Sequence, residues 1–384
     1  MGDLSPFFDS LFSPYLFLAL LISLAVIPLY RRLAIKYDLV DHPGGRKQHA
    51  MPVPLVGGLA IITASLASIY LWGFSKGHEG LVFSCGGLFL IGFIDDKYDI
   101  SAALRLIAQT TLVAVALYLD DVWLTQIALT KDIVLDLGVF AYPLTVVAVL
   151  ALINAVNMLD GLDGLSSGIV LITLGFIISV ASAASLTNVS FFATVFFGGV
   201  LGFWAYNYRF SWRERASVFM GDSGTIVLGF VLPYLAIKLA IEAPAYAPSS
   251  ILLWLFAIPI WDICAVIIKR MRDGRSPLSA GRDHIHHVLM QAGLTVRHTL
   301  HLIYLLTITT VSFGFAAQYF GFSQIESFAA FFIFMTFYLG RVGSLSRKPV
   351  AEVYDFKTHG DRRKTLTDID AEVVELNSRS KTLS

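Results

Sequence analysis

The sequence has few of the residues on which a soluble or disulfide-linked protein depends. Only 15% of its 384 residues are charged, whereas soluble domains carry about 25%. Its two cysteines, Cys85 and Cys264, both lie in apolar runs and form no CxxC pair. The P-loop and HExxH patterns are missing as well. These absences argue against a soluble multidomain protein, a disulfide framework and the common signatures of P-loop and zinc-protease sites.

Long apolar runs are what the sequence has in abundance. Hydrophobic residues make up 56% of the chain, and the mean hydropathy is +0.70. A helix of about 20 apolar residues crosses the bilayer core, so we predict an all-α polytopic membrane protein with about eleven transmembrane helices. The predicted spans are residues 12–30, 55–73, 81–94, 103–119, 138–154, 164–184, 189–206, 224–241, 250–268, 299–317 and 326–340.

Positive charge is distributed unevenly between the two sets of loops that these spans define. One set, together with the segment from Arg341 onward, holds 25 of the 28 Lys and Arg residues, and the other holds only Lys76, Lys131 and Lys238. Basic loops lie on the cytoplasmic side of a membrane. We therefore predict a periplasmic N-terminus and a cytoplasmic C-terminus. Residues 1–341 would form the membrane domain, and residues 342–384 a partly disordered cytoplasmic tail.

Five polar clusters, far apart in the sequence, fall on this predicted cytoplasmic face. They are GRKQHAMPVPLVGG (45–58), FIDDKYDIS (93–101), NAVNMLDGLDGL (154–165), VFMGDSGT (218–225) and GRDHIHH (281–287). Ionisable groups at the ends of membrane spans are usually functional. The convergence of the clusters on one face is the main functional signal in the sequence.

Asp95 and Asp96 are adjacent at the end of the third predicted span. Neighbours on a helix point about 100° apart, so the two carboxylates need not face one site. A solvated helix end, with Lys97 beside it, is the alternative interpretation. We interpret the pair as functional because of its position at the end of a span.

A polar stripe begins where the fifth predicted span ends. Asp160 and Asp163 are three residues apart and would share one face of a helix, and Asn154 and Asn157 have the same spacing. Oxygen ligands and amide donors in this pattern suit Mg²⁺, a phosphate or ribose hydroxyls. A helix N-cap would explain one of the acids but not the whole stripe.

Two further clusters point to the same chemistry. Asp222 lies between glycines at a predicted helix start, where backbone N–H groups attract anions and the acid can hold a cation, although a simple cap is the alternative. His284, His286 and His287 lie in a basic loop beside Arg282. Zinc is the alternative ligand, but the chain lacks a matching Cys pair. Histidine and arginine also donate to phosphate and sugar, so we predict Mg²⁺-dependent phosphoryl transfer between a soluble diphosphate and a lipid-borne acceptor.

In order, the five motifs resemble those of the polyprenyl-phosphate N-acetylhexosamine-1-phosphate transferases, from about residue 30 to 300. The patterns RKxH…PLVGG and HIHH resemble the WecA branch more than the peptidoglycan branch, which has TPTMGG and HHH. The resemblance implies transfer of GlcNAc-1-phosphate from UDP-GlcNAc to undecaprenyl phosphate, with release of UMP. It implies an active site on the cytoplasmic face of the bacterial inner membrane and a role in O-antigen or enterobacterial common antigen synthesis.

The resemblance also implies a cofactor, partners and residue roles. The cofactor would be Mg²⁺, with Mn²⁺ as a substitute; no nucleic acid is expected, and a homodimer is left open. Either Asp95 or Asp96 would be a general base, and Phe219 would stack on uracil. The implied catalytic residues are Asp95, Asp96, Asp160 and Asp163; the substrate-binding residues are Lys47, Asn157, Phe219, Arg282, His284, His286 and His287; the metal ligands are Asp222 and Asp96.

Three alternatives stay open on the sequence. The sugar nucleotide could be another UDP-HexNAc, such as UDP-GalNAc or a 6-deoxy sugar. The protein could be a transporter, which would place its acids near the bilayer midplane, or a lipid-binding scaffold without turnover. The lipid phosphate could attack directly, which we favour, or an aspartate could attack first and form a phospho-enzyme.

Overall fold

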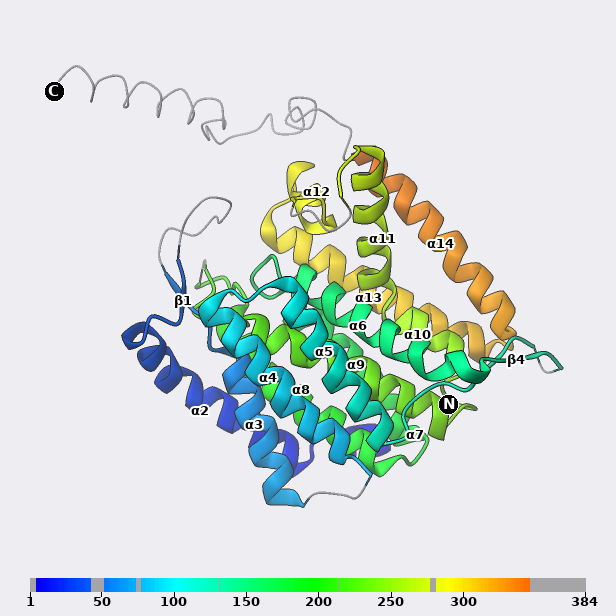
Figure 1. The fold of residues 1–384 in the computed structure, drawn as a ribbon, viewed down its shortest axis with the longest axis horizontal. Coiled ribbons are helices and arrows are strands. Elements are labelled where there is room, and N and C mark those ends of the chain that lie inside the picture. The colour runs from blue at the N-terminus through cyan, green and yellow to red at the C-terminus, as the bar shows by residue number, and fades with distance from the viewer. Residues whose placement is uncertain are drawn as a thin grey trace.

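The computed structural model describes residues 5–42, 52–73, 77–130, 132–213, 215–276 and 281–345. These residues form a bundle of long helices with two short antiparallel hairpins (Figure 1). The helices are α1 (Ser5–Leu11), α2 (Pro14–Lys36), α3 (Gly57–Trp72), α4 (Glu79–Tyr98), α5 (Ala102–Leu119), η1 (Gly138–Phe140), α6 (Ala141–Leu159), α7 (Leu165–Ala183), α8 (Thr187–Asn207), α9 (Asp222–Glu242), α10 (Ser249–Leu255), α11 (Ala257–Arg272), α12 (Ile285–Gln291), α13 (Val296–Tyr319) and α14 (Gln324–Leu345). The strands are β1 (Val40–Asp41), which pairs with β2 (Val53–Pro54), and β3 (Gln126–Ala128), which pairs with β4 (Val134–Asp136).

The all-α, multi-span fold is confirmed. Each of the eleven predicted ranges coincides with one of these helices, or with the pair α10 and α11, which is bent by 69°. Among the described helices, eight are long and apolar enough to cross a membrane, or nine if the bent pair is one span. Helix α3 is shorter, and α4 ends in charged residues. The count of eleven and the orientation of the termini therefore stay predictions.

Helix α9 forms the centre of the bundle, because its residues are apolar all round and most are buried. Small residues let its first turn approach two neighbouring helices closely. A Cβ atom on Gly58 of α3 would lie 2.3 Å from the backbone nitrogen of Gly224, and one on Gly92 of α4 would lie 2.5 Å from Cα of Ser223. Only glycine permits this backbone contact. The first turn of α9 is thereby fixed against the end of α4.

A second group of helices packs beside this bundle. Trp254 of α10, Trp261 of α11 and Phe331 of α14 form an aromatic core, with ring centroids 5.3–6.4 Å apart. The indole N–H of Trp254 donates to the hydroxyl of Ser327 at 3.0 Å. In Figure 1, α11 and α14 approach one another at their upper ends, and α12 lies beside the upper part of α11. This group carries α12, which packs on α13 and α14.

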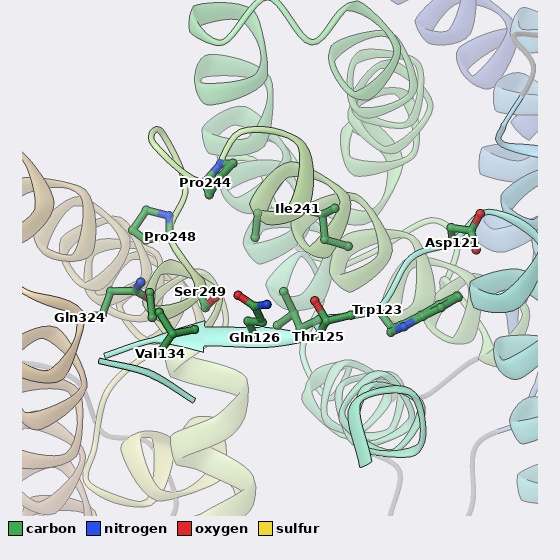
Figure 2. A pocket seen from close by; sticks show the side chains of 13 residues that line it. Asp121, Trp123, Thr125, Gln126, Val134, Ile241, Pro244, Pro248, Ser249 and Gln324 are labelled. Carbon is green, nitrogen blue, oxygen red and sulfur yellow. The ribbon is translucent and has the colours of Figure 1, made fainter. Parts of the chain in front are cut away.

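The bundle has two ends of different character. We call the end that carries Asp95, Asp96, Asp160 and Asp222 the carboxylate end. The other is the hairpin end, where β3 and β4 project beyond the helices (Figure 1). A cavity of about 420 Å³ lies at the hairpin end (Figure 2). Among its thirteen lining residues only Asp121 is ionisable, so this cavity lacks the groups that phosphoryl transfer needs.

Candidate active site

Asp95 and Asp96 lie inside the last turn of α4, not after the span as the range 81–94 implied. The helix continues to Tyr98 and ends at Asp99, whose φ of 50° is left-handed. The Asp95 side chain is only 2% exposed. Its Oδ1 accepts from the N–H of Ile100 at 2.9 Å, and its Oδ2 accepts from Nη1 of Arg105 at 2.5 Å. Asp95 is therefore an ion-paired acid that also closes the turn between α4 and α5.

Asp96 joins α4 to α9. Its two oxygens accept from the backbone N–H groups of Asp222 at 2.7 Å and Ser223 at 3.1 Å. A carboxylate at the positive end of a helix dipole is stabilised by roughly 0.3–2 kcal/mol. The contact is intimate because Gly221, with φ of 74°, turns the chain into α9, and a Cβ there would lie 2.5 Å from Asp96 Oδ2. The metal-ligand and general-base roles of Asp96 stay predictions.

Asp222 is the point at which three motifs meet. Its Oδ1 accepts from the amide of Asn157 at 2.6 Å, and its Oδ2 lies 3.4 Å from Nη1 of Arg105. The Asn157 amide also donates to Thr225 at 2.7 Å, which holds its orientation. The structure thus brings together side chains from the FIDDKYDIS, NAVNMLDGLDGL and VFMGDSGT segments. This convergence is what the sequence predicted for these clusters.

Asp160 and Asp163 do not share a helix face, so that prediction is wrong. Helix α6 ends at Leu159, and both acids lie in the loop before α7. Gly164 has a φ of 88°, which breaks the helix that the spacing suggested. Burial, together with the charges of Asp222, Asp163 and Asp96, raises the pKa of Asp160 to about 7. Within the described residues no hydrogen-bond donor reaches the Asp160 carboxylate, so a cation or a proton would stabilise it.

Asp163 faces a different neighbour. Its Oδ2 accepts from Nε of Arg209 at 2.7 Å and from the N–H of Ala216 at 2.9 Å. Beside it, the Asn207 side chain accepts from the N–H of Gly164 at 2.7 Å and donates to the carbonyl of Val218 at 3.0 Å. These contacts tie the 160–164 loop to the segment that precedes α9. A catalytic role for Asp163 stays a prediction; its observed contacts hold loops together.

The segments around PLVGG and VFMGD pair along their backbones. Phe219 N–H donates to Pro54, Gly57 N–H donates to Phe219, and Gly58 N–H donates to Met220, all at 2.8–2.9 Å. The PLVGG segment therefore positions the residues that lead into Asp222. The Phe219 side chain is half-buried, and its stacking on uracil stays a prediction. Lys47 lies outside the described residues.

The histidine-containing loop is fixed to α11 by two acids. Burial alone would raise the pKa of Asp283, but Lys269 and Arg275 outweigh this effect and lower it to about 2. The carboxylate lies 2.7 Å from Lys269 and 3.2 Å from Arg275. Asp262, inside α11, accepts from Nδ1 of His284 at 2.8 Å. Asp262 thus provides a second attachment of this loop to α11, in addition to Asp283.

His286 brings this loop to the NAVNMLDGLDGL segment. A Cβ on Gly161 would lie 2.4 Å from Nε2 of His286, so the ring packs directly on the glycine. The His286 and His287 rings are 4.2 Å apart. Burial and then the neighbouring imidazoles lower the pKa of His286 well below 6.5, and burial and His284 also lower that of His287. Arg282, beside them, is exposed.

The sequence patterns do not identify four residues of the site, which are Arg105, Asn207, Arg209 and Asp262. In the sequence Arg105 is one of many basic loop residues, although it lies one turn into α5 and contacts Asp95 and Asp222. Asn207 and Arg209 carried no motif that would single them out. Asp262 did give a signal, because an acid within the apolar run IPIWDICAVII is rare and usually functional.

The described side chains do not by themselves supply a full set of ligands for a metal ion. In the part of the chain that the structure describes, no three His, Cys, Asp or Glu side chains lie close enough together to hold one. Mg²⁺, however, is commonly bound by one or two carboxylates, with substrate phosphates and waters as the other ligands. The donor-free carboxylate of Asp160 and the nearby carboxylate of Asp222 fit that smaller requirement.

Comparisons with known proteins agree with this arrangement. Residues 78–240 match the family model described as glycosyl transferase family 4. Proteins named undecaprenyl-phosphate alpha-N-acetylglucosaminyl 1-phosphate transferase are similar along most of the chain. The one from Salmonella typhi is 32% identical over 314 residues, which cover 81% of this chain and 84% of that protein. The one from Escherichia coli (strain K12) is 32% identical over 75% of this chain and 79% of its own length.

A third relative, from Pasteurella multocida (strain Pm70), carries the same name and is 32% identical over 80% of this chain and 87% of its own length. The alignments therefore extend well beyond the 78–240 segment. The resemblance that the five motifs indicated is confirmed. This chain therefore belongs to the same family as these undecaprenyl-phosphate alpha-N-acetylglucosaminyl 1-phosphate transferases, which it resembles along most of its length.

Proposed function

We propose that this protein transfers GlcNAc-1-phosphate from UDP-GlcNAc to undecaprenyl phosphate, giving undecaprenyl-diphosphate-GlcNAc and UMP. The observation that carries the proposal is the meeting of Asn157, Asp96 and Arg105 around Asp222. Asp96, Asn157 and Asp222 come from three separate motifs, in a chain whose relatives bear the name of this activity. Acids, an amide and a guanidinium at one point suit the binding and transfer of a phosphoryl group.

The surroundings of Arg105 support a lipid-borne acceptor. On α5, its neighbours Leu104, Leu106 and Ile107 are 56%, 47% and 65% exposed. In a membrane these side chains face the acyl chains, so an apolar surface reaches the edge of the carboxylate end. A polyprenyl tail would lie in the bilayer beside α5, and its phosphate would reach the Arg105 guanidinium.

We propose Mg²⁺, with Mn²⁺ as a substitute, as the cofactor, held by Asp222 and Asp160 and by the substrate phosphates. When bound, the ion would offset the negative charge of the diphosphate. Asp96 would hold the first turn of α9, and with it the backbone of Asp222, in place. Asn157 would fix the rotamer of the Asp222 side chain through its hydrogen bond to Oδ1.

For the chemical step we propose direct attack by the lipid phosphate on the β-phosphorus of UDP-GlcNAc. The bond from that phosphorus to the bridging oxygen breaks, and UMP departs with the electron pair. A phosphate monoester is already a competent nucleophile at neutral pH, so no covalent enzyme intermediate is needed. Arg105 would orient the attacking phosphate, and the loop of His284 and Arg282 would hold the sugar diphosphate.

We place the site on the cytoplasmic face of the bacterial inner membrane, where soluble UDP-GlcNAc is available. The basic loops at the carboxylate end support this orientation. The product would serve O-antigen or enterobacterial common antigen synthesis. A transporter would need acids near the bilayer midplane, whereas Asp95, Asp96, Asp160 and Asp222 all lie at helix ends. The position of these acids favours the enzyme.

The test is the identity of the product. Purified full-length protein would be incubated with undecaprenyl phosphate, Mg²⁺ and either UDP-GlcNAc or UDP-GalNAc, and the lipid products identified by mass spectrometry. The proposal expects undecaprenyl-diphosphate-GlcNAc as the preferred product. A preference for UDP-GalNAc would move the assignment to another UDP-HexNAc. A folded protein that makes no lipid diphosphate from either nucleotide would overturn the transferase assignment.

A further inference from the structure

Asp262 is a buried acid in the middle of an apolar helix. It lies on α11, six residues after the bend that separates α11 from α10, and it is 1% exposed. Burying a carboxylate is costly unless charged or hydrogen-bonding partners compensate. The helix itself does not need the group, since its backbone is already hydrogen-bonded along its length. The reason for an acid at this position therefore lies in what it contacts.

Both oxygens of Asp262 contact the histidine-containing loop. Oδ2 lies 2.8 Å from Nδ1 of His284, and Oδ1 accepts from the backbone N–H of Ile285 at 2.7 Å. The two contacts are to adjacent residues, so the carboxylate fixes both the backbone and the ring of this point in the loop. Because a carboxylate only accepts hydrogen bonds, Nδ1 of His284 must carry the hydrogen. The other ring nitrogen, Nε2, is then the one that can meet a substrate.

Attachment of the loop does not depend on Asp262 alone. Asp283 already holds it to the end of α11 through ion pairs with Lys269 at 2.7 Å and Arg275 at 3.2 Å. What Asp262 adds is control of one imidazole. The His284 ring is nearly parallel to that of His286, at 8° and 5.9 Å, and His286 packs on Gly161 beside Asp160. The contacts of Asp262 therefore fix the His284 ring beside the imidazole that packs against the loop of Asp160.

We propose that Asp262 is a positioning residue for the reaction, which acts by fixing the ring orientation and the Nδ1–H tautomer of His284. The inference rests on the proposed function, in which the His284 loop holds the sugar diphosphate. Carboxylates that orient functional histidines in this way contribute on the order of tenfold to a hundredfold to activity. Asp262 does so from within the helix, without touching the substrate.

The test compares Asp262→Asn with a matched control. Asparagine keeps the size and one acceptor, but if that oxygen accepts from Ile285, the amide N–H₂ group faces His284 and reverses its tautomer. Asp120→Asn removes another buried carboxylate, at the hairpin end, where it accepts from the N–H groups of Gly80 and Leu81. We expect kcat for UMP release to fall about tenfold to a hundredfold in Asp262→Asn and to stay within about twofold of wild type in Asp120→Asn.

A double-mutant cycle separates positioning from general destabilisation. If Asp262 acts through His284, adding Asp262→Asn to His284→Ala lowers kcat no further. Asp262→Glu keeps both acceptors and should recover part of the loss. Selective ¹⁵N labelling of histidine gives a readout independent of turnover, because the His284 ring shifts report which nitrogen is protonated. Wild type should show the Nδ1–H form, and Asp262→Asn should lose it.

The outcomes distinguish this inference from the proposed function. If wild type releases UMP and Asp262→Asn has wild-type kcat and the wild-type tautomer, the inference is overturned alone. Equal losses from Asp262→Asn with and without His284 would also overturn it, because they indicate a structural role. If Asp262→Asn does not fold, the cycle is run with Asp262→Glu, which should lower kcat only when His284 is present. Wild type that releases no UMP would overturn the proposed function and this inference together.

Discussion

The two ends of the helix bundle both contain buried aspartates, but they use them differently. At the hairpin end, Asp120 accepts from the N–H groups of Gly80 and Leu81 at 2.8 and 2.7 Å and from the hydroxyl of Tyr234 at 2.7 Å. Each of its oxygens has a donor. Asp120 therefore caps α4 and fastens α5 and α9 to it.

At the carboxylate end Asp95, Asp96 and Asp222 also accept hydrogen bonds, but Asp160 lies among other acids instead. Asp160 has no donor among the described residues, and burial with the neighbouring carboxylates raises its pKa to about 7. Such crowding costs free energy in the absence of a ligand and is typical of functional sites. The comparison shows that burial of an acid does not by itself indicate function. A cluster of acids that raise one another's pKa, with one of them lacking a donor among the described residues, is the better indication.

Replacing the acid proposed to hold the metal ion at the carboxylate end should lower activity the most. Asp222→Asn should reduce kcat by on the order of a thousandfold, because it removes a negative charge proposed to hold the metal ion. The asparagine still accepts from Asn157, so folding should be retained. Initial rates of UMP release and thermal unfolding in detergent would be measured together. Near-wild-type turnover in a folded Asp222→Asn protein would contradict the assignment of the carboxylate end as the active site.

The next effect concerns Arg105, which sequence patterns did not single out. Arg105→Ala should lower kcat/KM for undecaprenyl phosphate by roughly a hundredfold, since it removes a charge-assisted contact to phosphate and leaves Asp95 unpaired. Arg105→Lys should recover only part of the loss, because a lysine ammonium lacks the planar guanidinium that can contact Asp95 and a phosphate through different N–H groups. Rates would be measured over a series of lipid concentrations. A change confined to KM for UDP-GlcNAc would move Arg105 to the nucleotide side of the site.

Asp120→Asn should show the reverse pattern, with lower stability and unchanged turnover. Replacing one acceptor oxygen by an N–H₂ group places a donor against a backbone N–H or the Tyr234 hydroxyl. The expected cost is about 1–3 kcal/mol of unfolding free energy. Thermal or denaturant unfolding in a fixed detergent would measure it. A lower kcat without lower stability would show that the hairpin end influences catalysis at the carboxylate end. That result would contradict the separate roles assigned to the two ends.

The smallest effect is a dependence of stability on pH at the histidine-containing loop. The folded-state pKa of His286 lies well below 6.5, mainly through burial. The unfolded chain then binds a proton near pH 6.5 that the folded chain does not bind. Stability is therefore complete above pH 6.5 and decreases below it, by at most about 1.4 kcal/mol per pH unit. Unfolding midpoints at pH 7.5 and 5.5 should differ less in His286→Gln than in wild type.

Much of the fold could be predicted because hydrophobic length alone determines it. Each apolar run of the sequence became a helix, and the polar motifs met at one end because each lies at the end of a span. The local geometry could not be predicted in the same way. The three-residue spacing of Asp160 and Asp163 suggests a helix, but α6 ends at Leu159, Asp160 leaves the helical conformation with ψ of 45°, and Gly164 is left-handed.

The partners of the site residues were also beyond the reach of sequence patterns. Asp96 contacts the first turn of α9 more than 120 residues later, through close packing of Gly92 on Ser223. Asp262 and His284 meet because the chain returns to α11 after leaving it. Such contacts depend on tertiary packing, which no local spacing encodes. The acid inside an apolar run was the one visible sign of Asp262.

The most direct test of the central claim is UMP release by the purified wild-type protein with UDP-GlcNAc and Mg²⁺, with undecaprenyl phosphate present or omitted and with an EDTA control. If the carboxylate end transfers the phosphosugar to the lipid, UMP is released only when both the lipid phosphate and the divalent ion are present. UMP release without the lipid would indicate hydrolysis of the nucleotide and contradict the transfer reaction. A folded protein that releases no UMP under any of these conditions would contradict the assignment of the carboxylate end as a catalytic site.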